Sequence, residues 1–517
     1  MIRLVLTTLA RNEVRLRMRR SSTIVALLAV VAMSWAMIAD PASGNALLVL
    51  GKARVLYTSS ALALGSAVLA AFLFGLGGFY LVRGRMSEDI RSGAGGVIGA
   101  TPVANSLFLA GRWLGGVAYL SALVGAFMLT MMALHLVRGD GPVQPLVYLQ
   151  TYAVLLMPMI FFTVSCAILF DSVARLMGKG GDVLFFFVWV AQFTVMTQAG
   201  KAGADPFAML FDFSGTGIAV LAIKAQLHTT NFQVGASAFD PALAPLVLPS
   251  MLWSGQAMLV RTLSALAGLL PLLPAIALFH RYSPDKVNVS AARRRRSPLA
   301  VVNGLLRPVS VLARPLFALA ARLPGMAGQV AGEVALSFAI APSALLAAPA
   351  LAIAALVVEA RLLPAVLMAA AAFWGILVSD LSSRDYAAGT GDMTGAVGGG
   401  VARRYLRQYA ATLVLGLVFT GAVALRWSFS APHLALALLA GLAALGALAS
   451  LFGRTSRSAR LFVALFLFWF YVALNVRKVP RLDVVGFNGV ADAASAAMYA
   501  AIAAAALAIG YAINRRV

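Results

Sequence analysis

Asp89-Ile-Arg-Ser-Gly93-Ala-Gly95-Gly-Val-Ile-Gly99-Ala100 returns later in this chain as Asp385-Tyr-Ala-Ala-Gly389-Thr-Gly391-Asp-Met-Thr-Gly395-Ala396. The two stretches share the pattern D-x3-G-x-G-x3-G-A at a constant offset of 385 − 89 = 296 residues. Each copy follows a hydrophobic segment and leads through arginines into the next one. An internal repeat in a membrane chain indicates two equivalent halves around a central pathway. The repeat therefore predicts the architecture of a transporter.

Composition places the chain in a membrane. It is 61% hydrophobic and only 11% charged, and apolar runs of about 18 residues or more, long enough to cross a bilayer, recur along it. The single cysteine, Cys166, excludes a disulfide framework. The net charge of +23 comes from arginines between the apolar runs, where they set topology against anionic lipid. No basic soluble module is present to bind nucleic acid.

The pattern predicts an all-α polytopic membrane protein with twelve transmembrane helices in two tandem six-helix halves. We expect the spans at about 23–39, 60–82, 107–136, 147–170, 183–197 and 258–280, then at 343–358, 362–379, 409–425, 433–452, 461–475 and 491–511. With both termini cytoplasmic, most Lys and Arg residues fall on the inner side, as the positive-inside rule requires. The expected location is the cytoplasmic (inner) membrane of a bacterium.

Four domains follow from these spans. Residues 1–22 form an amphipathic interfacial helix, and 23–280 form the first six-span half with an extracytoplasmic cap at 198–257. Residues 281–342 form a basic interfacial linker, and 343–517 form the second half. A signal peptide at the N-terminus and a thirteenth span within 298–323 are the less favoured alternatives, the latter because Arg307 and Arg314 would lie in hydrocarbon.

Two weaker features also repeat. Asn12-Glu13-Val14 resembles Gly332-Glu333-Val334 at an offset of 320 residues. The fifth span of each half is rich in aromatic side chains, which either pack against lipid at the interface or line a substrate pathway. The residues that such a pathway would use are Phe186, Trp189, Phe468 and Trp469. Asp171, Asp182 and Asp380 fall at the inner ends of spans, where they can be solvated.

The first loop resembles that of a type-2 ABC exporter permease. The residues that carry the resemblance are Glu88, Asp89, Arg91, Ser92, Gly93, Gly99, Ala100, Thr101, Pro102 and Val103, followed by Gly111-Arg112. The resemblance implies a coupling helix that docks into a cleft of a cytoplasmic ATPase, and two six-span permeases fused in one chain. The second loop departs from the pattern, with Val397-Gly398-Gly399-Gly400 in place of Thr101-Pro102-Val103-Ala104.

The residues expected to contact the ATPase lie in the two copies of the loop. They are Asp89, Gly93, Gly95, Gly99, Ala100, Thr101 and Pro102 in the first copy, and Asp385, Gly389, Gly391, Gly395 and Ala396 in the second. None of the Gly-Lys pairs of the chain is followed by Ser or Thr, so no Walker A loop is present to hold phosphates. ATP and Mg²⁺ would therefore bind to the partner, a separate ABC ATPase in two copies.

Catalytic and metal-binding groups do not cluster in the sequence. His135, His228, His280 and His433 are far apart, so we expect neither a metal site nor an enzyme. The first hypothesis is a permease subunit that exports a lipid, a peptide or another amphiphile, with membrane lipid and a further extracytoplasmic protein as additional partners. The alternatives are a twelve-span secondary carrier and a membrane enzyme or assembly scaffold.

Overall fold

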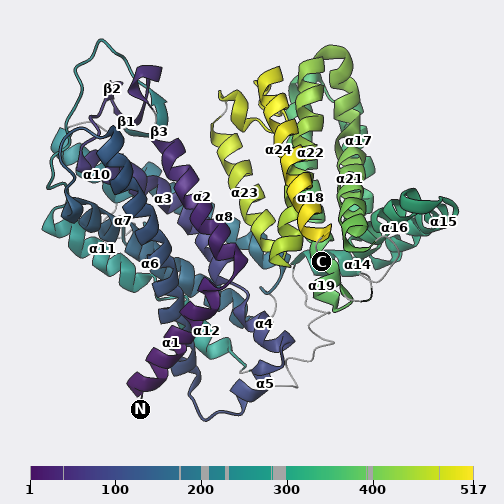
Figure 1. The fold of residues 1–517 in the computed structure, drawn as a ribbon, viewed down its shortest axis with the longest axis horizontal. Helices are drawn as coiled ribbons and strands as arrows, with labels where there is room; N and C mark the ends of the chain where they lie inside the picture. The colour runs from purple at the N-terminus through teal and green to yellow at the C-terminus, as the bar shows by residue number, and fades with distance from the viewer. Residues whose placement is uncertain are drawn as a thin grey trace. The chain divides into compact units, whose positions relative to one another are not determined.

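The chain separates into two compact units, residues 1–295 and 296–517. The computed structural model describes residues 2–38, 40–173, 176–199, 209–227, 232–280, 282, 298–391, 393, 400–476 and 478–515. The boundary between the units falls inside the segment 281–342, which the sequence predicts to be a linker. Each unit is mostly helical (Figure 1).

Long apolar helices dominate both units. Within the described residues, eight helices are long and apolar enough to cross a membrane, or nine if one bent pair counts as a single span. This confirms a helical, multi-pass membrane protein. The predicted spans at 23–39 and 461–475 correspond to shorter apolar helices, Thr23–Trp35 and Arg460–Asn475, which fall below the length of about 20 residues that spans a bilayer. The number twelve thus stays a prediction.

The first unit is built around one buried helix, α3. The described helices of this unit are α1 (Ile2–Met18), α2 (Ser21–Met37), α3 (Ser59–Val82), α4 (Arg85–Arg91), α5 (Ala94–Gly99), α6 (Asn105–Arg138), α7 (Pro145–Ser172), α8 (Lys179–Ala199), α10 (Thr216–Leu227), α11 (Gly255–Ala267) and α12 (Leu272–Leu278). Helices α6, α7 and α8 pack around α3, which is apolar on all sides and therefore buried along nearly its whole length.

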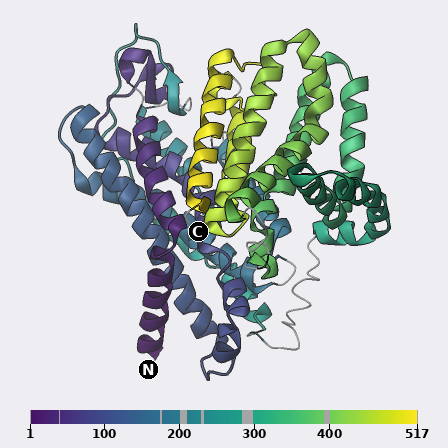
Figure 2. The ribbon, with the colours of Figure 1, turned by 45° about the vertical axis from the view of Figure 1, so that its right-hand side comes forward.

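The N-terminal helix α1 packs along α6 (Figure 2). A Cβ atom at Gly111 would lie 2.7 Å from the side chain of Leu9, and one at Gly115 would lie 2.6 Å from that of Glu13. Two glycines four residues apart let helices approach closely in a membrane protein. The polar residues Glu13 and Arg17 of α1 are consequently buried against α6.

A small sheet in the first unit is absent from the sequence-based prediction. Strands β1 (Asn45–Leu50), β2 (Ala53–Arg54) and β3 (Phe232–Ala238) are arranged in the order β2-β1-β3, and both pairings are antiparallel. Strand β3 belongs to the predicted cap at 198–257. This cap is therefore joined by backbone hydrogen bonds to the segment between α2 and α3.

The second unit contains a bundle of long helices with a shorter set beside it. Its described helices are α14 (Pro298–Leu305), α15 (Arg314–Arg322), α16 (Gly325–Ile340), α17 (Pro342–Val357), α18 (Leu363–Val378), α19 (Arg384–Ala388), α21 (Gly400–Ser430), α22 (Pro432–Ser456), α23 (Arg460–Asn475) and α24 (Ala493–Arg515). Helix α24 packs along α22 through a cluster of alanines: Ala444, Ala447, Ala503 and Ala506. Small residues of this kind allow close helix packing in membranes.

The end of α3 in the first unit is held by buried charges. Arg83 is 1% exposed and forms ion pairs with Asp182 in the first turn of α8 and with Asp171 at the end of α7. Its guanidinium also lies 5.1 Å from the ring of Phe79. The suggestion from the sequence that Asp171 and Asp182 can be solvated is therefore wrong, because both carboxylates turn inward to a shared arginine. Asp380 is partly exposed and pairs with Arg384 at 3.1 Å.

Replacing Arg83 by Met should strongly destabilise the protein. The change leaves the carboxylates of Asp171 and Asp182 buried without their cation, and breaking a buried ion pair in this way costs about 3–5 kcal/mol. Thermal melting of the purified chain in detergent measures the loss. The control is Arg361→Met, because the side chain of Arg361 is 78% exposed. Equal melting temperatures for the two variants would show that the network contributes nothing.

Candidate functional site

The first copy of the repeated loop folds as two short helices joined by Ser92 and Gly93. Helix α4 ends at Arg91, and Gly93 adopts the left-handed conformation with φ of +74° before α5 begins at Ala94. A residue with a Cβ atom rarely adopts this conformation, which explains the glycine. The turn lets the loop double back between the end of α3 and the start of α6 (Figure 1).

Asp89 anchors this loop to α6 and to the segment that follows α12. Its side chain is 2% exposed and forms an ion pair with Arg112 of α6. The phenol of Tyr282, which follows α12, donates a hydrogen bond of 2.7 Å to Oδ2 of the same carboxylate. Burial raises the pKa of Tyr282, so the phenol stays protonated and remains a donor. Arg112 belongs to the Gly111-Arg112 pair that the sequence analysis singles out. No pattern in the sequence indicates that Tyr282 takes part in this site.

Ion pairs also connect α4 to the N-terminal helix. Arg85 lies 3.5 Å from Glu13, and Glu88 accepts a hydrogen bond from Arg20. Glu13 in turn pairs with Arg17 at 2.7 Å. A displacement of α4 would therefore act on α1 as well as on α6.

The glycines of the first loop have different environments. A Cβ atom at Gly95 would lie 2.9 Å from the ring of Tyr282, so this glycine approaches its own chain. Gly96 faces open space, and Val97 is 73% exposed. Gly99 closes α5, while Ala100, Thr101 and Pro102 follow it and are exposed. The outward surface of the loop is thus small and apolar around Val97.

The second copy has the same local plan. Asp385 lies in α19, and Gly389 ends that helix with φ of +70°, matching Gly93 at the repeat offset. The side chain of Gln408 donates to Asp385 at 3.4 Å, and Arg404 lies 3.5 Å from the same carboxylate. Arg404 also donates to the carbonyl of Gly391 at 3.1 Å. Gly395 and Ala396 lie outside the described residues.

The partners of the two aspartates occupy matching positions in the repeat. Arg112 follows Asp89 by 112 − 89 = 23 residues, and Gln408 follows Asp385 by 408 − 385 = 23 residues. The charged partner of the first copy is therefore a neutral amide in the second. Asp385 is also 22% exposed, against 2% for Asp89. The aspartate of the second loop is therefore bound more weakly than that of the first, although its partner has the same spacing in the sequence.

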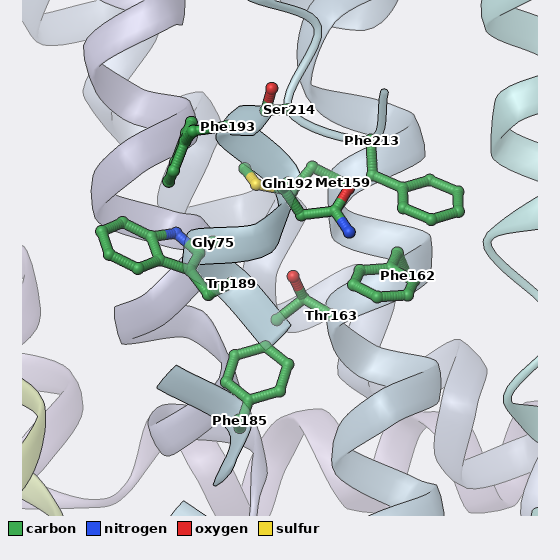
Figure 3. Close-up of a pocket in the computed structure, with 10 residues that line it drawn as sticks. All are labelled: Gly75, Met159, Phe162, Thr163, Phe185, Trp189, Gln192, Phe193, Phe213 and Ser214. Carbon is green, nitrogen blue, oxygen red and sulfur yellow. The ribbon is translucent and has the colours of Figure 1, made fainter. Parts of the chain in front are cut away.

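The aromatic candidates of the first unit lie in its interior. Phe186 and Trp189 of α8 are buried, and the indole of Trp189 packs on α3 where a Cβ atom at Gly75 would be 2.8 Å from its nitrogen. Figure 3 shows Trp189 beside a cavity that Gln192, Met159 and Thr163 also line, whereas Phe186 is not among the residues around it. Its volume is about 10 Å³, which holds a single water. The cavity is closed to any larger molecule.

The aromatic candidates of the second unit have a different environment. Phe468 and Trp469 of α23 are half-buried. The indole of Trp469 donates to the carbonyl of Leu482 at 3.0 Å, and its ring lies 6.1 Å from that of Phe487. Trp469 thus fixes the segment that joins α23 to α24.

Groups that could hold a metal ion do not assemble in the described part of the chain. No three His, Cys, Asp or Glu side chains come together among residues whose placement is described. His135 is buried in α6, where its ring contacts the hydroxyl of Tyr148 at 3.2 Å. His228 lies outside the described residues.

Comparison with protein-family models, with curated proteins and with solved structures finds no match for this chain. Any assignment of function therefore depends on the two loops and their surroundings.

Substituting Asn for the two repeated aspartates should give unequal losses of stability. Asp89→Asn leaves the buried guanidinium of Arg112 without a counter-charge, at a cost of about 3–5 kcal/mol. Asp385→Asn is milder, because Asp385 is 22% exposed and its contacts with Arg404 and Gln408 are longer, at 3.5 and 3.4 Å. Tryptophan fluorescence during thermal melting compares the two variants. A larger loss for Asp385→Asn would contradict this account of the repeat.

Proposed function

We propose that the chain is the membrane-spanning permease subunit of an ATP-driven exporter. The observation that carries the proposal is the repeated loop, with an aspartate, a left-handed glycine and a partner of the aspartate 23 residues further on in both units. Two copies of one loop in a multi-pass membrane protein suit a partner that binds twice.

The exposed surface of the first loop supports a docking role. Helix α5 contains no charged residue and presents Gly96 and Val97 outward. A small apolar tip can enter a cleft of another protein, and burial of apolar surface of this kind stabilises association. The loop is also backed by a rigid set of ion pairs, so a push on α5 would be passed to α6 and α1 through Asp89 and Arg85.

The energy source must then be a separate protein. The sequence contains no Walker A loop to bind phosphates. We propose that a cytoplasmic ABC ATPase, present in two copies, binds ATP and Mg²⁺ and contacts one loop with each copy. Lipids, peptides and other amphiphiles are the proposed classes of substrate.

The proposal also fixes the orientation of the chain. Both termini and both loops would lie in the cytoplasm of a bacterium, and the sheet β2-β1-β3 would lie on the opposite side of the inner membrane. The excess of arginine in the segments near the loops favours this orientation.

Val97→Asp should reduce the ATP hydrolysis that this chain stimulates in a partner ATPase by tenfold or more. The change places a charge on an apolar contact surface that no described residue of the chain covers, so folding is unaffected. The assay is permease-dependent hydrolysis by ATPases co-purified from the native membrane. The matched control is Val247→Asp, at another exposed valine in the segment before α11. Unchanged stimulation by Val97→Asp, or a permease that transports with no ATPase bound, would refute the proposal.

Cysteine labelling tests the orientation separately. In a Cys166→Ser background, Gly96→Cys should react with an impermeant maleimide only after cells are permeabilised, whereas Val247→Cys should react in intact cells. Gly96 is suitable because its Cβ direction is open. Labelling of Gly96→Cys from outside would reverse the proposed topology.

A further inference from the structure

The second unit contains a large apolar groove that the proposed function does not use. Its volume is about 580 Å³, within the range of about 300–1,000 Å³ typical of ligand sites. Four helices line it: α15, α16, α17 and α21. The lining residues are Leu316, Leu319, Ala331, Val334, Phe338, Leu345, Ala348, Pro349, Ala352, Val414 and Val418. Every one of these side chains is apolar.

A sharp bend in the backbone opens the groove. Helices α16 and α17 meet at an angle of 103° (Figure 1). Pro342 begins α17 and cannot continue the hydrogen bonding of α16, so the two helices diverge. Pro349 lies inside α17 and forms part of the wall. The groove is therefore a built feature of the backbone, and it does not depend on the rotamer of a single side chain.

The shape and lining of the groove match a hydrocarbon chain. At roughly 30 Å³ for each water-sized group, the volume accommodates about twenty such groups, which is the size of one fatty acyl chain. No hydrogen-bonding side chain lines the groove to orient a polar ligand. An occupant must therefore be apolar along its length.

Three arginines lie in α15 and in the 3-10 helix that precedes it. Arg314 and Arg322 begin and end α15, and Arg307 begins the 3-10 helix Arg307–Ala313 that precedes it. The stretch 298–324 contains these three cations and no acidic residue. All three side chains are exposed, and none forms an ion pair with an acidic side chain of the described residues. The apolar side chains between them, Leu312 and Phe317, are exposed as well.

This combination identifies the occupant. A basic amphipathic helix inserts its apolar side chains at the acyl boundary of a bilayer and attracts anionic headgroups. We propose that the groove binds one anionic phospholipid of the surrounding membrane. One acyl chain fills the groove between α16 and α17, and the phosphate lies against Arg314 and Arg322. The site is independent of ATPase docking, so it stands whether or not the proposed function is correct.

Native mass spectrometry of the full chain tests the proposal. The chain is reconstituted with equal amounts of phosphatidylglycerol and phosphatidylcholine and then released from the bilayer. We expect one retained lipid, with phosphatidylglycerol enriched at least threefold. Ala352→Trp fills the groove and should abolish retention, whereas the control Ala350→Trp, at an exposed position of the same helix, should not. Equal retention by these two variants would overturn the site.

A charge variant and a label on the unmodified chain complete the test. Arg314→Gln combined with Arg322→Gln should bring the enrichment of phosphatidylglycerol close to parity, while Arg361→Gln keeps it. Phosphatidylglycerol with a photoreactive acyl chain should crosslink the wild-type chain within residues 316–352 or near Val414 and Val418 of α21. This result does not depend on the folding of any variant. Crosslinks confined to other helices would overturn the proposal.

Discussion

The ion pair between Asp89 and Arg112 determines the course of the chain around the repeated loop. Neither side chain is open to water, so each requires the other. This requirement brings the end of α4 against α6, and the hydrogen bond from Tyr282 brings the segment after α12 to the same place. Three parts of the first unit that are distant in sequence thus converge on one carboxylate. The position of α5 at the tip of the loop follows from this convergence.

Spacing in the sequence reveals the loop because its geometry is local. An aspartate followed four residues later by a left-handed glycine leaves a pattern that survives in both copies, and the partner 23 residues further on lies in the adjoining helix. Tyr282 leaves no such pattern, because it reaches Asp89 from 193 residues away. A contact of that kind depends on how whole helices pack, and a single sequence does not encode it in any periodicity.

Other differences between sequence and structure have similar causes. Asp171 and Asp182 stand at the ends of apolar runs, where hydropathy alone places them in water. Both carboxylates instead form ion pairs with the buried guanidinium of Arg83, which requires a counter-charge. The strand Asn45–Leu50 is a short apolar run of the type that fits either a helix or a strand, and its pairing with β3, far along the chain, selects the strand. From the sequence, Phe186 and Trp189 could face either lipid or the protein interior. In the structure Trp189 packs in the interior, because the missing side chain of Gly75 leaves room for its indole.

The contact between α1 and α6 has a mechanical consequence. Because Gly111 and Gly115 bring the two helices close together and Glu13 and Arg17 are buried between them, α1 cannot slide or roll without breaking polar contacts in an apolar setting. The two helices therefore move as one stiff body. A larger side chain at Gly111 or Gly115 would push α1 away from α6 and expose the buried polar contacts of Glu13 and Arg17.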